Sequence, residues 1–174
     1  HYMIERRMML EGYCVIDGKE QKSRAAFNDI IIHRGTNPSV KTLIIRVNGE
    51  YLNTYVGDGI IVATPSGSTA YNMSAGGPIV DPKAKLLLVT PINSHSLNAK
   101  SIVLSADDQI EIEISARNHE TDDSAEVSFD GDYTIKLGFG DKIVIKKAEQ
   151  ATNILKLSKL SFLEILSKKM QTCI

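Results

Sequence analysis

The chain has 174 residues, of which 43% are hydrophobic and 24% are charged, and its formal net charge at pH 7 is −1. This length is enough for one substantial core, so we predict a single domain over residues 1–174. The near-neutral charge and the scattered Lys and Arg residues argue against nucleic acid as a partner. No apolar run reaches the roughly 20 residues that a membrane-spanning helix needs, so we expect no membrane association.

The termini and the cysteines indicate the compartment. The first residues are charged and lack the pattern of a secretory signal, while His1-Tyr2 is compatible with an expression scar. The two cysteines, Cys14 and Cys173, lie near opposite ends without a partner motif. Both observations predict a reduced, cytoplasmic protein.

The first third of the chain is predicted to consist of strands separated by turn residues. Residues 3–16 begin charged and become apolar, and Asp17-Gly18 then signals a hairpin. Asn48-Gly49 is the strongest hairpin signal in the chain. Further strands are expected at residues 25–32, 40–47 and 51–56.

The stretch Gly57–Pro78 reads GDGIIVATPSGSTAYNMSAGGP. Its apolar segment, residues 60–63, is short and β-branched, which favours a buried strand. The turn that follows Ala63 should lead into a helix of two to three turns that ends at the double glycine. A strand followed by a hydroxyl-rich helix start exposes N–H groups that suit a phosphate, a ribose or a base edge. Taken alone, the pattern favours an ordinary strand-turn-helix in which Ser66 caps the helix.

The second half is predicted to be mainly β, ending in a helix. An apolar strand over residues 85–89 should be broken by Pro91, and a polar loop over residues 93–97 follows. The C-terminal helix over residues 161–170 has a capping pattern of Ser161 with Glu164. Short strands at this spacing indicate a β-sandwich or a related layered sheet. The other strands are expected at residues 101–104, 109–115, 125–129, 133–137 and 142–146.

The sequence contains none of the common phosphate or metal signatures. No P-loop, GxGxxG, HExxH or paired CxxC motif is present, so we predict no metal site in this chain. Isolated polar residues have ordinary explanations. Asp58 and Asp130 precede glycines and suit plain turns, Asn28-Asp29 suits a strand kink, and His95 suits a structural hydrogen bond.

Taken together, four segments resemble the C-terminal domain of the NAD kinases. Asn28-Asp29 is similar to the family's Asn-Glu/Asp motif, and residues 57–78 match its long DG…TPSGSTAY…GGP signature. Residues 91–97 (PINSHSL) are similar to its PxxPHSL segment, and Phe129-Asp130-Gly131 followed by the FLEIL helix completes the pattern. The resemblance departs at Ser94 and Lys100-Ser101, where the family often has Pro and Arg-Pro.

The resemblance implies a function. The reaction would transfer a phosphoryl group from ATP or polyphosphate to the adenosine 2′-hydroxyl of NAD, giving NADP, with Mg²⁺ present and in a homodimer or homotetramer. The family's catalytic aspartate lies in a GGDGT motif of an N-terminal domain. That motif does not occur here, so no catalytic residue is expected in this chain and the isolated chain should be inactive.

The resemblance also implies the binding residues. The adenosine part would be surrounded by Asn28, Ser66, Thr69, Ala70, Tyr71 and Ser74, with Asp29 beside Asn28 as an NAD-binding residue. Asp58, from a neighbouring subunit, and the loop with His95 would meet the nicotinamide end. Asp130 would lie near the transferred phosphate. Two alternatives stay open: the C-terminal domain of a diacylglycerol or sphingosine type lipid kinase, whose members lack the TPSGSTAY run, and a non-catalytic β-sandwich binding module.

Overall fold

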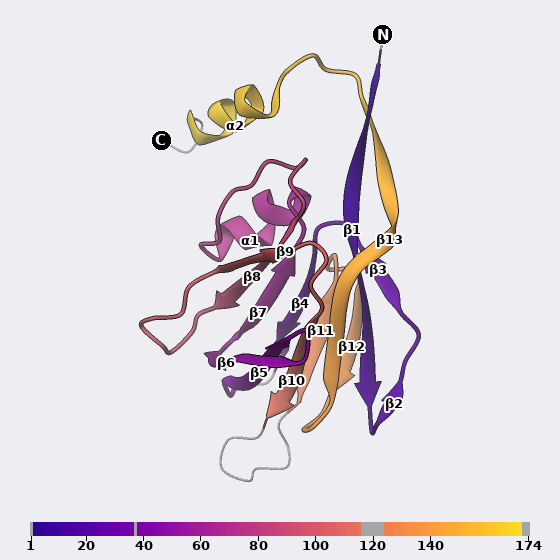
Figure 1. Cartoon of the computed structure of the whole chain (residues 1–174). Coiled ribbons are helices and arrows are strands. Elements are labelled where there is room, and N and C mark those ends of the chain that lie inside the picture. The colour runs from indigo at the N-terminus through magenta and orange to yellow at the C-terminus, as the bar shows by residue number, and fades with distance from the viewer. Residues whose placement is uncertain (1, 37, 116–123, 172–174) are drawn as a thin grey trace.

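The computed structural model describes residues 2–36, 38–115 and 124–171. Two antiparallel sheets lie face to face, and the start of β1 (Met3–Ile16) lies at the same end of the molecule as helix α2 (Phe162–Gln171) (Figure 1). The prediction of a mainly β, sandwich-like domain with a short inserted helical segment and a C-terminal helix is confirmed. His1 and Cys173 lie outside the described residues.

The first sheet is built around a long pair of strands. β1 pairs with β13 (Lys142–Lys156) along almost its whole length, from Met3 opposite Lys156 to Val15 opposite Lys142. The pairing has one irregularity, between Met8 and Leu10. β10 (Ile110–Ser115) alternates buried isoleucines with half-exposed glutamates, so one face of this sheet lies in the core and the other faces solvent. The sheet has the order β2 (Lys19–Glu20), β1 (Met3–Ile16), β13 (Lys142–Lys156), β10 (Ile110–Ser115), β5 (Lys41–Val47) and β6 (Glu50–Gly57), and β3 (Arg24–Ala26) pairs with β1.

The second sheet contains the strands next to the motifs that resemble the NAD kinases: β4 begins at Asp29, β7 follows Asp58, and β11 ends at Phe129. All of its pairings are antiparallel, so the start of each strand lies beside the end of its neighbour. Its order is β12 (Tyr133–Leu137), β11 (Ala125–Phe129), β4 (Asp29–His33), β7 (Gly59–Ala63), β8 (Leu86–Ile92) and β9 (Ile102–Ser105).

The central strands of the second sheet are buried on both faces. Ile30, Ile60 and Val62 join the main core between the two sheets. Ile31 and Ile61 point the other way, into a smaller cluster that also contains Ala75 and Val80 from the segment after β7. Burial on both faces explains the unbroken apolar runs of β4 and β7, because each fully buried isoleucine contributes about 1.5–3 kcal/mol.

The structure corrects three strand boundaries. The strand predicted over residues 142–146 continues as β13 to Lys156, because its second half pairs with the first residues of β1. Residues 25–32 are not one strand: β3 belongs to the first sheet and β4 to the second, and the chain bends at Phe27-Asn28 as it crosses between them. Pro91 does not break its strand, since β8 runs through it to Ile92. β9 pairs only with Leu86–Val89, so at Pro91 that side of β8 is an edge, where a residue without an N–H is tolerated.

The predicted helix of two to three turns is wrong in its form. The chain instead makes a 3₁₀ turn, η1 (Ser66–Thr69), and a single α-helical turn, α1 (Tyr71–Ser74), separated by Ala70 with φ −94° and ψ −134°. Ser66 does not cap a helix, because the N-cap position is held by Pro65 and no side chain bonds there.

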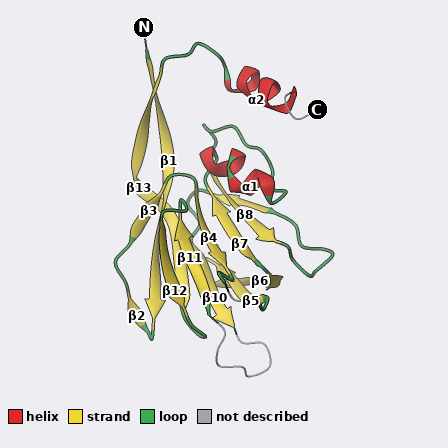
Figure 2. Ribbon diagram, turned by 180° about the vertical axis from the view of Figure 1, so that it is seen from behind, coloured by secondary structure: helices red, strands yellow, loops and turns green. Residues whose placement is uncertain are grey.

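The C-terminal helix α2 (Phe162–Gln171) is confirmed with its capping box. The Glu164 N–H donates to Ser161 Oγ at 3.1 Å, and the Ser161 N–H donates to the Glu164 carboxylate at 2.6 Å. Figure 2 shows α2 standing apart from both sheets, and none of its residues is buried. In the described part of the chain, no helix is long and apolar enough to cross a membrane.

Candidate functional site

Three segments that are distant in sequence meet at one end of the second sheet. Asp29 opens β4 opposite Ala63, the last residue of β7, and Phe129 closes β11 opposite Ile30. The bend before β4, the turn after β7 and the Asp130-Gly131 turn after β11 therefore lie side by side.

The Asp130 carboxylate holds the backbone of the bend. It accepts hydrogen bonds from the N–H groups of Phe27 at 2.6 Å, Asn28 at 2.7 Å and Asp29 at 3.1 Å. Asp130 itself has a left-handed backbone, with φ 51°, and Gly131 continues the turn at φ 78°. Hydrogen bonds to a charged acceptor are stronger than neutral ones, so this carboxylate fixes where the Asn28 side chain emerges.

Asp29 is a carboxyl group placed in an unfavourable environment. The residue is 4% exposed. Burial, followed by the nearby negative charge of Asp130, raises the pKa of Asp29 from 3.8 to about 6. Perturbed carboxyl groups of this kind concentrate at functional sites, because a fold rarely keeps them for stability alone.

The turn after β7 is tied directly to the same bend. Thr64 donates its N–H to the Asn28 carbonyl at 2.9 Å and its hydroxyl to the Phe27 carbonyl at 2.8 Å. The Thr64 hydroxyl also accepts the Gly67 N–H at 3.0 Å. A Cβ added to Gly67 would lie 2.0 Å from the Asn28 carbonyl oxygen, so only glycine allows this close approach.

Two polar residues within the turn and helix serve as internal anchors, and the sequence did not single them out. The fully buried Asn72 donates to the carbonyls of Ser68 and Pro78, both at 3.1 Å, and accepts the Thr90 hydroxyl at 2.7 Å. The Ser68 hydroxyl accepts the Val80 N–H at 3.0 Å. The i, i+4 spacing of Ser68 and Asn72 was the available signal.

The other side chains of the segment remain available to a ligand. Ser66, Thr69 and Ala70 are half-buried, whereas Tyr71 and Ser74 are exposed. Tyr71 keeps 44% of its surface exposed. Residues 66–74 therefore divide into two groups: Ser68 and Asn72 point inward and hold the segment in place, and the remaining hydroxyl and aromatic side chains face outward.

Asp58 and His95 lie at the opposite end of β7. The Asp58 carboxylate pairs with Arg34 Nε at 3.3 Å and accepts the Asn93 side-chain amide at 2.9 Å. His95 is exposed and donates its backbone N–H to the Val56 carbonyl at 2.8 Å. Since β7 has five residues, roughly 13 Å of strand separates this group from the Asn28 bend.

A shallow cavity of about 300 Å³ connects the Asp58 group with Tyr71. It offers the face of an aromatic ring, a carboxylate and a side-chain amide, which together suit a planar heterocycle carrying an amide or amino group. The cavity is lined by Ile31, His33, Arg34, Gly35, Asp58, Tyr71, Ile92, Asn93 and Ser128.

Within residues 2–36, 38–115 and 124–171, no group of three His, Cys, Asp or Glu residues is arranged to hold a metal ion.

Comparison with known proteins agrees with this geometry. Residues 27–157 match the family model of the ATP-NAD kinase C-terminal domain. An NAD kinase of Agathobacter rectalis is 56% identical over 97% of this chain and 59% of its own length, and one of Lachnospira eligens is 46% identical over 97% and 61%. The chain thus spans about 60% of the length of these curated relatives.

Two solved structures have the same fold. A yeast NADH kinase complexed with NADH has a TM-score of 0.91 and 28% identity, covering 97% of this chain and 50% of that one. An NAD kinase from Archaeoglobus fulgidus in complex with ATP has a TM-score of 0.72 and 28% identity, covering 90% and 56%. This chain belongs to the NAD kinase family and corresponds to its C-terminal domain. These findings give the lipid-kinase alternative no support.

Proposed function

We propose that this chain forms the NAD-binding part of an enzyme that transfers a phosphoryl group from ATP or polyphosphate to the adenosine 2′-hydroxyl of NAD, giving NADP. One observation carries the proposal. Hydrogen bonds hold the Asn28-Asp29 bend and the Thr64–Tyr71 segment in a fixed arrangement. The hydroxyl and aromatic side chains that face away from these bonds can contact a nucleoside. The NADH complex of the similar yeast enzyme supports a dinucleotide as the ligand.

The binding roles follow from the side-chain chemistry. Asn28 and Thr69 would hydrogen-bond the adenosine edge, and Tyr71 would offer a flat apolar face with a polar tip. Ser66, Ala70 and Ser74 would line the same pocket, and Asp29 would support Asn28 from beneath. Phosphoryl transfer requires mainly positioning and charge stabilisation from the protein, and these groups supply the positioning of the acceptor.

Asp58 and His95 would bind the nicotinamide end from a neighbouring subunit. Within one chain, Asp58 shares a cavity with Tyr71 but lies at the end of β7 opposite Asn28. Following the family resemblance, we propose a homodimer or homotetramer in which Asp58 of a neighbouring subunit meets the Asn28 group. Mg²⁺ would enter together with ATP as part of the donor substrate. Asp130 near the transferred phosphate stays a proposal, and its observed contacts are with the bend.

The test is a calorimetric titration of the chain with NADP. Asn28→Ala should weaken binding at least tenfold, whereas Asn53→Ala, at an exposed position on β6, should leave it unchanged. Equal affinity of the two variants would contradict the proposed site. A separate turnover assay should find that this chain alone phosphorylates NAD no faster than background, since it contains no GGDGT motif.

A further inference from the structure

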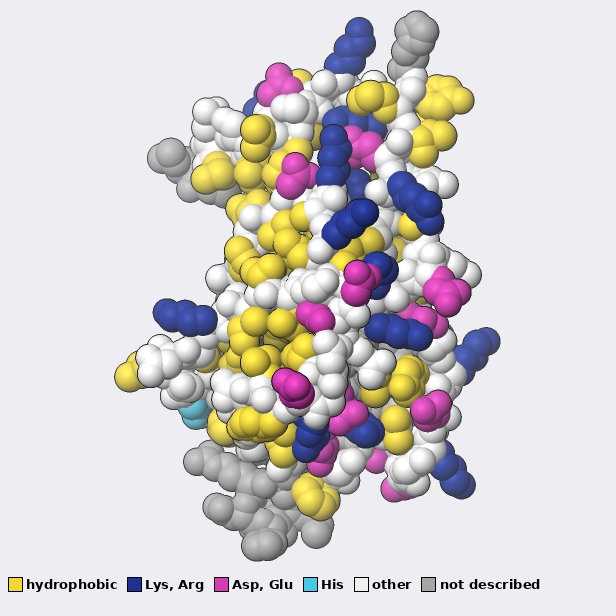
Figure 3. All heavy atoms as spheres, in the orientation of Figure 1, with side chains coloured by type: hydrophobic (Ala, Val, Ile, Leu, Met, Phe, Trp, Pro, Cys, Tyr) yellow, Lys and Arg dark blue, Asp and Glu magenta, His cyan; other side chains and the backbone are white. Residues whose placement is uncertain are grey.

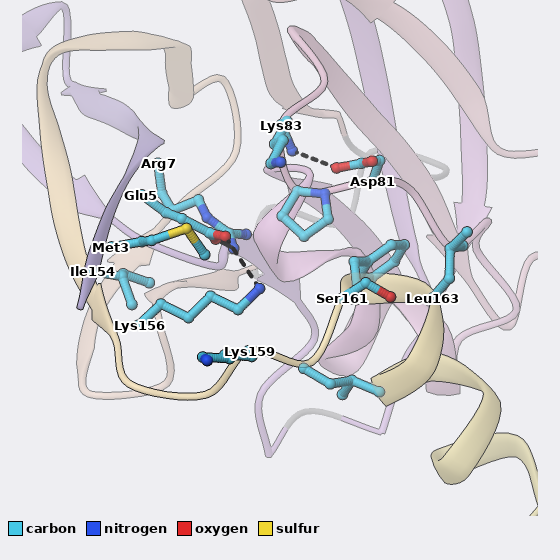
Figure 4. A pocket seen from close by; sticks show the side chains of 13 residues that line it. Met3, Glu5, Arg7, Asp81, Lys83, Ile154, Lys156, Lys159, Ser161 and Leu163 are labelled. Carbon is cyan, nitrogen blue, oxygen red and sulfur yellow. Dashed lines mark hydrogen bonds and ion pairs between the residues drawn. The ribbon is translucent and has the colours of Figure 1, made fainter. Parts of the chain in front are cut away.

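A second and larger cavity, of about 560 Å³, lies beside the nucleoside site. Its walls come from the start of β1, the end of β13, residues 81–83 and the beginning of α2 (Figure 4). None of its lining residues lines the cavity at Tyr71 and Asp58.

The charge of this cavity is predominantly positive. Its lining residues include the cations Arg7, Lys83, Lys156 and Lys159 and only two carboxylates, Glu5 and Asp81. Figure 3 shows Lys and Arg side chains gathered beside β1 and β13 on this face. A cavity with an excess of cations concentrates anions, because its low-dielectric walls reduce screening.

Two of the cations that line the cavity, Arg7 and Lys156, are sheltered and held in place. The side chains of Arg7 and Lys156 are 15% and 19% exposed, and both pair with Glu5, at 3.4 Å in the case of Lys156. Figure 4 shows the three side chains pointing toward one another. The two cations exceed the single carboxylate between them, so an incoming anion would meet a preorganised positive pair.

Arg7 also has unused hydrogen-bonding capacity and a link to the nucleoside site. Its Nε is buried without a hydrogen-bond partner. Its Nη1 lies 3.4 Å from the hydroxyl of Ser66, the first residue of η1. An anion bound at Arg7 would therefore lie next to the segment that we assign to adenosine.

We propose that this cavity binds the phosphate chain of the phosphoryl donor, with Arg7 and Lys156 as its principal contacts and Lys83 and Lys159 at its margin. The planar guanidinium suits the oxygens of a phosphate group, and the flexible lysines can follow a chain of several phosphates. The inference rests on the proposed function and deepens it. The shared chemistry is an oligophosphate, whether carried by a nucleoside triphosphate or present as inorganic polyphosphate.

The experiment measures the binding of tripolyphosphate and of ATP to the chain by calorimetry, with NADP titrated separately. Lys156→Met should weaken tripolyphosphate binding at least fivefold, and Glu5→Gln, which removes the competing carboxylate, should strengthen it. The control is Lys146→Met, which deletes the same charge from an exposed pair with Glu11 on the same two strands. Equal tripolyphosphate and ATP affinities would identify the phosphate chain as the recognised group, and tighter ATP binding would add the nucleoside.

Two results would overturn the inference. The first is a failure of tripolyphosphate to bind to a chain that binds NADP. The second is an equal loss of tripolyphosphate affinity in Lys146→Met and Lys156→Met, which would indicate a general charge effect. Loss of NADP binding alone, with the Lys156 effect intact, would count against the nucleoside site instead, so the two failures are distinguishable. Thermal melts of each variant verify that it is folded.

Discussion

Replacing Asp29 with asparagine should make the folded domain more stable at neutral pH. The folded state keeps this carboxyl in a buried place beside Asp130, which raises its pKa from 3.8 to about 6. A rise of that size corresponds to about 3 kcal/mol of folding free energy that the ionised group costs. An amide has the same shape and carries no charge, so it avoids this cost.

The pH dependence gives the sign of the effect. Below the unfolded value of 3.8 the carboxyl is protonated in both states and costs nothing. Between pH 3.8 and about 6 the unfolded chain releases the proton while the folded chain retains it, so stability falls as the pH rises. Above about pH 6 the whole cost of the ionised carboxyl is present. The free energy of unfolding of Asp29→Asn should then exceed that of the parent chain by up to about 3 kcal/mol.

The assay is urea unfolding of both chains at intervals from pH 4 to pH 8. The difference between the two unfolding free energies isolates Asp29 from the other titrating groups. Asp132→Asn, at an exposed position next to the same turn, is the control and should follow the parent chain. A difference that does not change between pH 4 and pH 7 would refute the reasoning, because Asp29 would then not titrate in this window.

Three further predictions concern the contacts that build the site. Asp130→Ala removes the acceptor of three backbone N–H groups and should lower the urea unfolding free energy by about 2–4 kcal/mol; a loss below about 1 kcal/mol would show that water replaces it. Gly67→Ala forces a Cβ against the Asn28 carbonyl and should abolish NADP binding in a titration, whereas Gly138→Ala, whose added Cβ would make only an ordinary 3.5 Å contact with Asp141, should not; equal NADP affinities would contradict the close approach. Ser161→Ala removes an N-cap and should destabilise α2 locally by about 1 kcal/mol, seen as faster amide exchange there alone, and unchanged exchange would argue against the cap.

The strand content was predictable because it depends on local pattern. The alternation of β10, the apolar run of β7 and the turn signal at Asn48-Gly49 are each contained in a few consecutive residues. The capping box at Ser161 is equally local. β7, β10 and the C-terminal helix were placed correctly to within about a residue or two. The start of β4 was not, because the strand predicted over residues 25–32 also took in β3 and the bend.

The features that the sequence could not supply depend on distant partners. The bend at Phe27-Asn28 exists because the chain changes sheets there and because Asp130, more than a hundred residues away, bonds its backbone. Local pattern alone predicted a continuous strand. The broken helix at Ala70 similarly follows from anchors outside the segment, such as the bond from Thr90 to Asn72.

The candidate residues were found as a set through the family resemblance, and the geometry divides that set in two. Asn28, Asp29 and Asp130 meet at one end of the second sheet with the turn after β7. Asp58 lies at the other end with Arg34 and Asn93. The spacing of these residues in the sequence does not predict this separation, because the separation depends on the direction in which β7 runs within the sheet.

The central claim is that the outward face of the Ser66–Ser74 segment binds the adenosine part of NAD. The most direct test compares Tyr71→Ala with Tyr51→Ala in NADP titrations, since both tyrosines are exposed, at 44% and 63%. We predict that Tyr71→Ala loses at least tenfold in affinity and that Tyr51→Ala binds as the parent chain does. Undiminished NADP binding by a folded Tyr71→Ala variant would contradict the account.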